Sequence, residues 1–242
     1  MLPAIVTDIE GTTSRIDFVH QVLFPYARAR ISEFLHEHQQ DPKVAAEIAA
    51  VRRTIAAPAV SLATVIQQLI DWIDQDRKVT ELKSLQGMIW QHGFESSQFS
   101  AHVYPDAVEC LGRWHQAGHS IYVYSSGSIA AQKLFFRYSV FGDLSALFSG
   151  YFDTTIGGKR EPGSYLRIAE AIDQAPGAIL FLSDLEAELD AAASAGLDTT
   201  QLIRADAPPE SHGRHRVASN FREVILVPGR QLNDRPAGSG LG

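Results

Sequence analysis

Short apolar runs alternate with longer amphipathic segments along the second half of the chain. Runs of about five apolar residues, such as residues 178–182, are typical of strands that are covered on both faces. Strands that alternate with helices predict a parallel, doubly wound sheet with right-handed crossovers. The expected elements of this α/β fold are strands at 3–7, 120–124, near Tyr151, at 178–182 and at 199–203, and helices at 105–117, 129–138, 165–172 and 186–195.

The segment between the first two strands follows a different pattern. Apolar residues recur there at three- and four-residue spacing, for example at Val65, Leu69 and Trp72, which predicts helices. The expected helices lie at 18–38, 42–57, 61–76 and 80–95, with Pro42 in a first turn and Ser61 and Thr80 as N-caps.

These two patterns predict the domain organisation. We expect an α/β core domain of residues 1–16 and 103–227, with an all-helical cap domain of residues 17–102 inserted just after the first strand. Such a cap can close over a small substrate and exclude water. The glycine- and proline-containing residues 228–242 are expected to form a disordered tail.

Composition limits the kinds of partner. The 242 residues carry a net charge of −7, which gives no basic surface for a nucleic acid. No apolar run approaches the roughly 20 residues of a membrane span, and the N-terminus lacks the basic region of a signal peptide. The single cysteine, Cys110, cannot form an internal disulfide and is interpreted as a buried thiol. We therefore expect a cytoplasmic protein without nucleic-acid or membrane partners.

Acidic residues follow the first predicted strand. Asp8 and Glu10 come directly after the apolar run and precede Gly11, which lets the chain turn sharply. In an open α/β sheet, ligands bind at the carboxyl ends of the strands. The two acids therefore lie where a ligand is expected, although an acid pair after a short apolar run is also typical of a solvated strand end.

Polar residues also follow the next two strands. Ser125 and Ser126 stand at a predicted strand-to-helix turn, where hydroxyl and N–H groups can bind a phosphate. The same residues would suit an ordinary N-cap cluster. Lys159 follows the strand near Tyr151 in a loop that contains Gly157 and Gly158. A lone lysine is most often a solvated surface charge.

The fourth of these strand ends carries acids again. Asp184 follows the run 178–182, and Glu188 lies one helical turn further on. An acid pair, a hydroxyl, a lysine and an acid thus end four strands in succession. Four unrelated coincidences would be needed to produce this order, so the pattern favours a phosphate-transfer site.

The motifs resemble those of a known family. Asp8 to Thr12, Ser125 or Ser126, Lys159 and Asp184 are similar to motifs one to four of the haloacid dehalogenase superfamily, over about residues 1–205. The strings DIEGTT, YSSGS, GGKREPGSY and FLSDLEAELDAA, with the helical insertion, further resemble the enolase-phosphatases of methionine salvage, also called acireductone synthases. DIEGTT is the most specific string, since most phosphatases of the superfamily carry aspartate at the position of Glu10.

The resemblance implies a phosphoric monoester hydrolase with one Mg2+ per chain. Asp8, Glu10 and Asp184 are the expected metal ligands, Glu10 through its backbone carbonyl. Asp8 would attack phosphorus and form an aspartyl-phosphate. Lys159, Ser125 and Ser126 would bind the phosphate of the substrate, with Lys159 also stabilising charge during transfer.

The resemblance also implies a substrate, 2,3-diketo-5-methylthiopentyl-1-phosphate, which is enolised and then dephosphorylated to the acireductone 1,2-dihydroxy-3-keto-5-methylthiopentene. Glu10 is the hypothesis for the base that removes the carbon-1 proton. Glu188 is expected to orient Lys159 or the metal site. The family resemblance further implies a monomer.

Other functions remain open. The chain could be a phosphatase of the same superfamily that acts on another small metabolite, because fold and motifs fix the chemistry better than the substrate. A dehalogenase would use the same aspartate nucleophile without Mg2+. A non-catalytic binding module is disfavoured, because all four motif positions keep reactive residues.

Overall fold

A computed structural model describes residues 3–205 and 213–226. Its contacts divide the chain into two compact units. Of the described residues, unit 1 contains 3–14, 103–126, 146–205 and 213–226, and unit 2 contains 15–102 and 127–145. The predicted tail at 228–242 lies outside the described residues.

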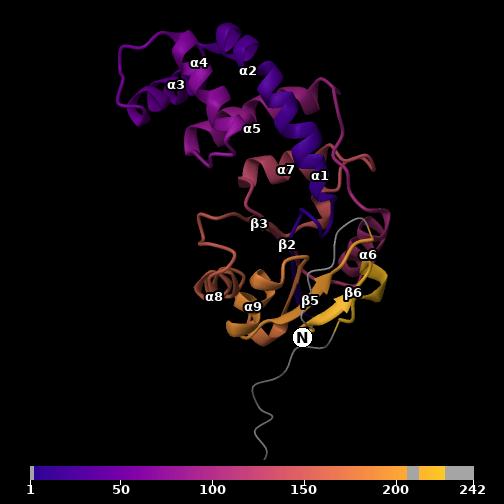
Figure 1. Cartoon of the computed structure of the whole chain (residues 1–242). Helices are drawn as coiled ribbons and strands as arrows, with labels where there is room; N and C mark the ends of the chain where they lie inside the picture. The colour runs from indigo at the N-terminus through magenta and orange to yellow at the C-terminus, as the bar shows by residue number, and fades with distance from the viewer. Residues whose placement is uncertain (1–2, 206–212, 227–242) are drawn as a thin grey trace, which may run out of the picture. The chain divides into compact units, whose positions relative to one another are not determined.

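Unit 1 contains one sheet in which all neighbouring strands are parallel. The spatial order of its strands is β3 (Gly150–Phe152), β2 (Ile121–Tyr124), β1 (Ala4–Thr7), β4 (Ile179–Ser183), β5 (Asp198–Leu202) and β6 (Arg216–Ala218) (Figure 1). The chain therefore starts in the middle of the sheet and builds outward in both directions. This confirms the predicted doubly wound parallel sheet.

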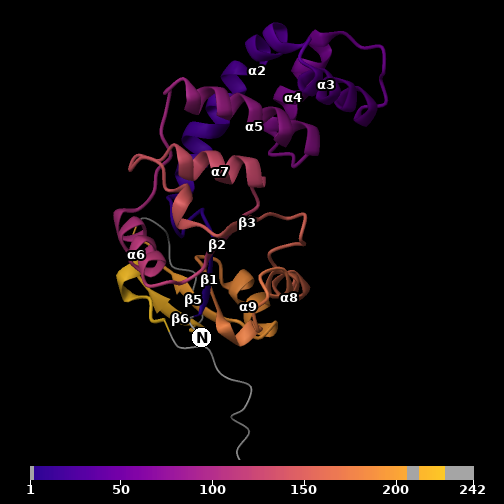
Figure 2. The ribbon, with the colours of Figure 1, turned by 180° about the vertical axis from the view of Figure 1, so that it is seen from behind.

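Helices cover both faces of this sheet. The helices of unit 1 are α6 (Pro105–Gln116), α8 (Pro162–Ala171) and α9 (Glu186–Ser194). Both ribbon views place α6 on the side of the sheet away from α8 and α9 (Figures 1 and 2). Right-handed crossovers require this, because the chain crosses toward β2 after β1 but toward β4 and β5 later.

Strand β6 was not expected from the sequence. It has only three residues, and two of them, Arg216 and Val217, are exposed. So short a segment at a sheet edge carries no hydrophobic pattern that would distinguish it from a loop.

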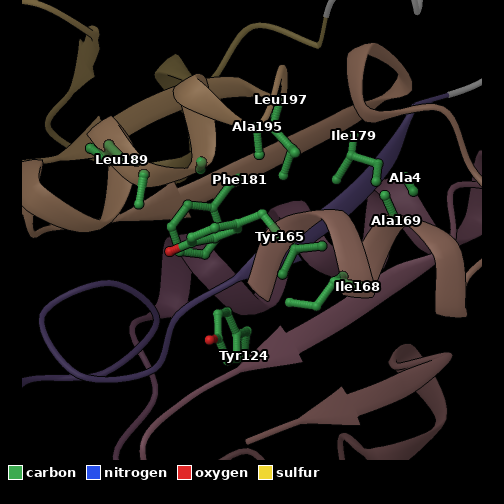
Figure 3. Close-up of a cluster of buried hydrophobic side chains, with 13 residues drawn as sticks. Ala4, Tyr124, Tyr165, Ile168, Ala169, Ile179, Phe181, Leu189, Ala195 and Leu197 are labelled. Atoms are coloured by element: carbon green, nitrogen blue, oxygen red, sulfur yellow. The ribbon is translucent and has the colours of Figure 1, made fainter. Parts of the chain in front are cut away.

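The aromatic core of unit 1 lies between the sheet and helices α8 and α9 (Figure 3). Tyr124, Tyr165 and Phe181 are fully buried there. The ring of Tyr165 meets that of Phe181 edge to face at 5.0 Å between centroids, and that of Tyr124 at 5.6 Å. Edge-to-face pairs of this kind favour one ring orientation, so the core holds both tyrosines in defined positions.

Unit 2 is helical. Its helices are α1 (Ile16–Phe18), the π-helical turn Val19–Leu23, α2 (Phe24–His38), α3 (Pro42–Thr54), α4 (Leu62–Asp74), α5 (Thr80–Glu95) and α7 (Ile129–Arg137). Ser61 caps α4 as expected, since its hydroxyl accepts from Thr64 N. Thr80 is not an N-cap: Val79 has the extended backbone of that position, and Thr80 is the first helical residue.

Helix α7 groups with unit 2, whereas the sequence assigned residues 127–145 to the core domain. Aromatic residues in α7 and just after it explain the grouping. Phe135 meets Phe18 edge to face at 5.8 Å, and Tyr138 stacks on Phe94 at 5.7 Å. The functional division into a core and a cap stays a prediction.

The insertion of residues 15–102 starts and ends at neighbouring points of unit 1. Tyr104 N donates a hydrogen bond to Thr13 O at 2.9 Å. The two ends of the insertion are therefore joined by a backbone hydrogen bond. Within the residues that the structure describes, no helix is long and apolar enough to cross a membrane.

Candidate active site

The strand register brings three of the predicted residues to one edge of the sheet. Thr7 of β1 lies beside Val123 of β2 and Leu182 of β4. Asp8, Ser125 and Asp184 are each the first residue after one of these strands, so all three stand at the carboxyl ends of adjacent strands. This is the edge at which open α/β sheets bind ligands.

Lys159 joins this edge through its side chain. Its Nζ lies 2.7 Å from Asp8 Oδ1 and 2.7 Å from Glu188 Oε2. Burial works against the charged ammonium, but the two carboxylates outweigh it and raise the pKa of Lys159 above its usual value. Lys159 is therefore a buried ammonium shared by two carboxylates, and not the solvated surface charge that a lone lysine usually is.

Glu188 is held in place by the end of β4. Ser183 Oγ donates to Glu188 Oε2 at 2.9 Å and accepts from Leu185 N at 3.2 Å. Burial, followed by the nearby charge of Asp8, raises the pKa of Glu188 to about 7. Of the two positions expected for Glu188, beside Lys159 or at the metal site, the contacts favour the one beside Lys159.

Asp184 is a half-buried residue with a buried Oδ1, beside the loop that follows β1. A Cβ on Gly11 would collide with the Asp184 carboxylate, so the glycine leaves the space that this carboxylate fills. Gly11 also has a φ of +70°, which favours glycine. Burial, then the charges of Asp8 and Glu188, raises the pKa of Asp184 to about 7.

The charges of this site fit a divalent cation. The buried carboxylates of Asp8 and Glu188 both contact the ammonium of Lys159, and the half-buried carboxylate of Asp184 lies close enough to interact with their charges. Asp184 Oδ1 is buried and has no hydrogen-bond partner among the described residues. A buried oxygen without a partner and an excess of negative charge are what Mg2+ would compensate. No group of three or more His, Cys, Asp and Glu side chains within the described ranges is arranged to bind a metal.

The remaining predicted residues differ in exposure. Ser125 is buried, and its N–H donates to Phe152 O of the neighbouring strand at 3.2 Å. Ser126 is exposed, and Glu10 is half-buried and forms a β-bridge with Ser14. Sequence reasoning treated the two serines alike, but only Ser126 presents its side chain to solvent.

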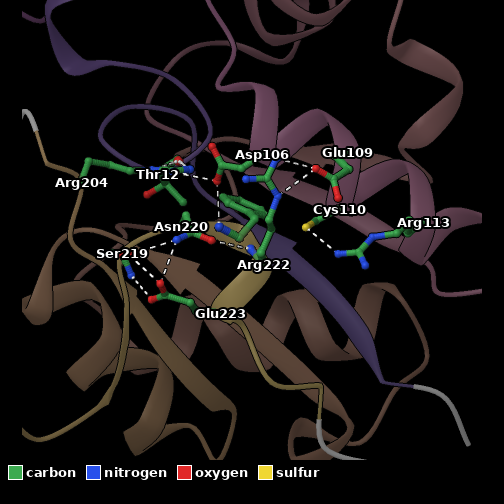
Figure 4. Close-up of polar contacts among 11 residues, drawn as sticks. Thr12, Asp106, Glu109, Cys110, Arg113, Arg204, Ser219, Asn220, Arg222 and Glu223 are labelled. Carbon is green, nitrogen blue, oxygen red and sulfur yellow. Dashed lines mark hydrogen bonds and ion pairs between the residues drawn. The ribbon is translucent and has the colours of Figure 1, made fainter.

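Sequence reasoning missed a buried arginine behind the Asp8 loop, which we define as residues 8–14. Arg204 donates through Nε and Nη2 to Thr12 O at 3.0 and 2.6 Å, and through Nη1 to Asp106 Oδ2 at 2.7 Å (Figure 4). Asp106 Oδ2 also accepts from Phe221 N at 2.8 Å. The guanidinium carbon of Arg204 lies 4.0 Å from the centre of the Tyr104 ring. A lone arginine after a strand gives no sequence signal of this role.

Comparison with known proteins identifies the family. A profile of haloacid dehalogenase-like hydrolases matches residues 2–196. The chain belongs to the haloacid dehalogenase-like hydrolases. The match covers Asp8, Ser125, Lys159 and Asp184, so these residues lie within the part of the chain that the family shares.

Several relatives share more than half of their residues with this chain. The enolase-phosphatase E1 of Yersinia pestis (strain Pestoides F) is 52% identical over 93% of this chain and 98% of its own length. That of Alcanivorax borkumensis is 53% identical over 94% and 100%. That of Pseudomonas fluorescens (strain Pf0-1) is 54% identical over 87% and 93%.

A solved structure has a similar fold. The UTR4 protein (Unknown transcript 4 protein) of Saccharomyces cerevisiae superposes with a TM-score of 0.81 at 32% identity, over 93% of this chain and all of that chain. A dehalogenase structure with a TM-score of 0.56 is 18% identical and supports the fold alone.

Proposed function

We propose that this chain is a Mg2+-dependent enolase-phosphatase, or acireductone synthase, of methionine salvage. Its substrate is 2,3-diketo-5-methylthiopentyl-1-phosphate, and its products are the acireductone 1,2-dihydroxy-3-keto-5-methylthiopentene and phosphate. The relatives named enolase-phosphatase E1, at 52 to 54% identity over most of the chain, support this activity. The observation that carries the proposal in the structure is the buried contact of Asp8 with Lys159 at the carboxyl edge of the sheet.

In this proposal, one Mg2+ is bound by the carboxylates of Asp8 and Asp184 and by the backbone carbonyl of Glu10. Two carboxylates suit Mg2+, which usually keeps several waters. The cation supplies the positive charge that lets a carboxylate approach a phosphate dianion. The buried Oδ1 of Asp184, which has no hydrogen-bond partner within residues 3–205 and 213–226, supports its role as a ligand.

Asp8 is the proposed nucleophile. Ile9 N donates to Asp8 Oδ1 at 2.8 Å, and Lys159 contacts the same oxygen, so the carboxylate has a fixed orientation. A carboxylate oxygen attacks phosphorus, the bond from phosphorus to the substrate oxygen breaks, and that oxygen takes a proton. Water then hydrolyses the aspartyl-phosphate and restores Asp8. Lys159 stabilises charge on the transferring oxygens, while Ser125 and Ser126 bind the phosphate.

Glu10 is the proposed base of the enolisation. Its carboxylate removes a proton from carbon 1, and the electron pair forms the double bond to carbon 2. The carbonyl oxygen of carbon 2 becomes an enolate, which takes a proton from water to give the enol. Glu10→Gln should then block formation of the enol phosphate, whereas a ready-made enol phosphate should still lose phosphate at a measurable rate. Equal enolisation by wild type and Glu10→Gln would remove Glu10 as the base.

The remaining elements of the proposal concern partners. The chain acts on a phosphorylated small molecule, as a cytoplasmic monomer, and binds neither nucleic acid nor membranes. The net charge of −7 and the absence of a membrane-spanning helix in the described residues are consistent with this.

The test is an assay with the diketone phosphate in which enol absorbance and released phosphate are followed together. We expect both signals, and both should require Mg2+. Phosphate release from sugar phosphates but not from the diketone phosphate would instead favour another phosphatase of the family. Activity on haloacids that survives EDTA would favour a dehalogenase.

A further inference from the structure

Four consecutive backbone carbonyls before α8 are each bound by a side chain. Arg167 Nε donates to Ile156 O, and Tyr124 OH donates to Gly157 O at 2.8 Å. The carbonyls of the next two residues, Gly158 and Lys159, accept from Ser164 Oγ at 2.8 Å and Tyr165 OH at 2.6 Å. These carbonyls lie in the Lys159 loop, which we define as residues 153–161.

This loop needs such contacts because it contains no helix or strand. Two adjacent glycines, Gly157 and Gly158, give its backbone more conformational freedom than other residues would. Backbone N–H and C=O groups outside helices and sheets need other hydrogen-bond partners. Here the carbonyls just before and at Lys159 are bound by side chains from β2 and α8.

The glycine at position 157 makes room for this arrangement. Its φ is +136°, a region that L side chains rarely adopt. A Cβ at this position would collide with Nη2 of Arg167 and Oγ of Ser164. The space that a side chain would need is therefore filled by two of the groups that bind the loop.

Two of the four donors are fixed by the core itself. Tyr124 and Tyr165 are fully buried, and their rings contact one another and Phe181 (Figure 3). Burial raises the pKa of both phenols above the usual value, so both keep the proton that they donate. Their hydroxyls are donors in rigid positions.

We propose that Tyr165 and Tyr124, helped by Ser164 and Arg167, are positioning residues that hold the Lys159 loop so that the ammonium of Lys159 reaches Asp8 and the transferring phosphoryl group. The inference rests on the proposed role of Lys159. Tyr165 acts most directly, because it binds the carbonyl of Lys159 itself. A lysine side chain has four flexible carbons, so its charge is well placed only if its backbone is fixed.

The test compares Tyr165→Phe and Tyr124→Phe with the matched control Tyr122→Phe. Phenylalanine keeps the packed ring and removes only the hydroxyl. Tyr122 lies on the same strand as Tyr124 and packs against the same core, but its hydroxyl is not one of the four donors. Steady-state kinetics with the diketone phosphate gives kcat and KM, and orthovanadate with Mg2+, measured by calorimetry, gives a binding constant that does not depend on turnover.

We expect Tyr165→Phe to lower kcat on the order of tenfold, with a smaller change in KM, because a displaced charge costs most in the transition state. Its affinity for orthovanadate should fall about fivefold in the wild-type background, but less than about twofold when Lys159→Ala is already present, because the hydroxyl acts through Lys159. Tyr124→Phe should behave likewise, and Tyr122→Phe should match wild type. Ser164→Ala tests the same loop if a tyrosine variant fails to fold.

Equal orthovanadate losses from Tyr165→Phe in both backgrounds would overturn the proposal, because the hydroxyl would then act independently of Lys159. Unchanged kcat and orthovanadate affinity in both tyrosine variants would also overturn it, while leaving the role of Lys159 intact. If Lys159→Ala itself leaves activity and orthovanadate affinity unchanged, the proposed role of Lys159 fails, and the positioning proposal fails with it. Failure on the diketone phosphate alone, with orthovanadate binding as expected, would count only against the substrate.

Discussion

The Asp8 loop and the Lys159 loop carry opposite charges to the same site, but their backbones are held differently. In the Asp8 loop, Ile9 O accepts from Thr12 N at 3.2 Å and from Ser14 N at 2.9 Å. Thr13 Oγ1 adds a bond to Asp8 O at 3.2 Å. The Lys159 loop also has local backbone bonds, such as that from Glu161 N to Gly158 O at 3.1 Å, but the carbonyls of residues 156–159 are bound by side chains of β2 and α8.

The two loops therefore differ in how far along the sequence their supporting residues lie. The Asp8 loop is held by hydrogen bonds between its own residues and by Arg204, while Ile9 N and Lys159 orient the Asp8 carboxylate. Lys159 depends on a packed core, because Tyr124 lies 33 residues away from the carbonyl that it binds. Substitutions in the core of unit 1 should therefore displace the ammonium of Lys159 more than the carboxylate of Asp8. Four substitutions test this ordering, and Asp8→Asn should slow turnover most.

Replacement of Asp8 by asparagine should have the largest effect. The amide keeps the shape of the side chain but loses the nucleophile and one negative charge beside Lys159. We expect phosphate release to fall by roughly a thousandfold or more, with the fold intact. Phosphate assays and circular dichroism check both parts. A folded Asp8→Asn protein with normal turnover would contradict the mechanism.

Replacement of Asp184 by alanine should act through the metal. Its carboxylate lies against Gly11 of the Asp8 loop and has a buried oxygen without a partner among the described residues. We expect the Mg2+ concentration for half-maximal activity to rise on the order of a hundredfold. Titration of chelator-treated enzyme with Mg2+ measures this. If the titration curves of variant and wild type coincide, Asp184 is not a ligand.

Replacement of Gly157 by alanine should disturb the Lys159 loop from within. The new methyl group would meet Arg167 and Ser164 and would require a strained φ. We expect kcat to fall on the order of tenfold, because displacement of a charged group by a fraction of an ångström is costly. Gly87→Ala is the matched control, since a Cβ there meets nothing within 4 Å. Equal kcat values for the two variants would show that turnover does not depend on the backbone of the Lys159 loop at Gly157.

Replacement of Arg204 by lysine should have the smallest effect on turnover. Lysine keeps a positive charge for Asp106 but cannot reproduce the two bonds to Thr12 O. The Asp8 loop is also held by hydrogen bonds between its own residues, so we expect kcat to fall only about twofold. The free energy of unfolding should fall by about 1–3 kcal/mol. Urea unfolding and kinetics measure the two quantities. A kcat loss larger than that of Tyr165→Phe would reverse the ordering.

The doubly wound sheet could be predicted from the alternation of elements. Asp8 and Asp184 stand out because acids that follow apolar runs are visible in the sequence, and Lys159 because it follows two glycines in a loop; their role as a site stays a prediction. The supports of the site were not found. The hydroxyls of Tyr124 and Tyr165 look like ordinary core aromatics until the fold directs them toward the Lys159 loop.

The missed features share a physical cause. Arg204 contacts Thr12 across 192 residues, and no local pattern encodes such a contact. Threonine is a suitable N-cap residue, but α5 begins one residue earlier than expected. Thr80 is therefore its first helical residue, and Val79 occupies the N-cap position. The exact first and last residues of a helix or strand depend on tertiary packing, which a periodic sequence pattern does not encode.

The hydrogen bond between Tyr104 N and Thr13 O has a consequence for chain entropy. Residues 15–102 form a closed loop as seen from unit 1, and the entropy cost of closing a loop rises only with the logarithm of its length. Doubling the length of the insertion would add only about 0.6 kcal/mol. Whole helices can therefore be added to or removed from this segment during evolution or in engineering, while the sheet edge that carries Asp8 is almost unaffected in free energy.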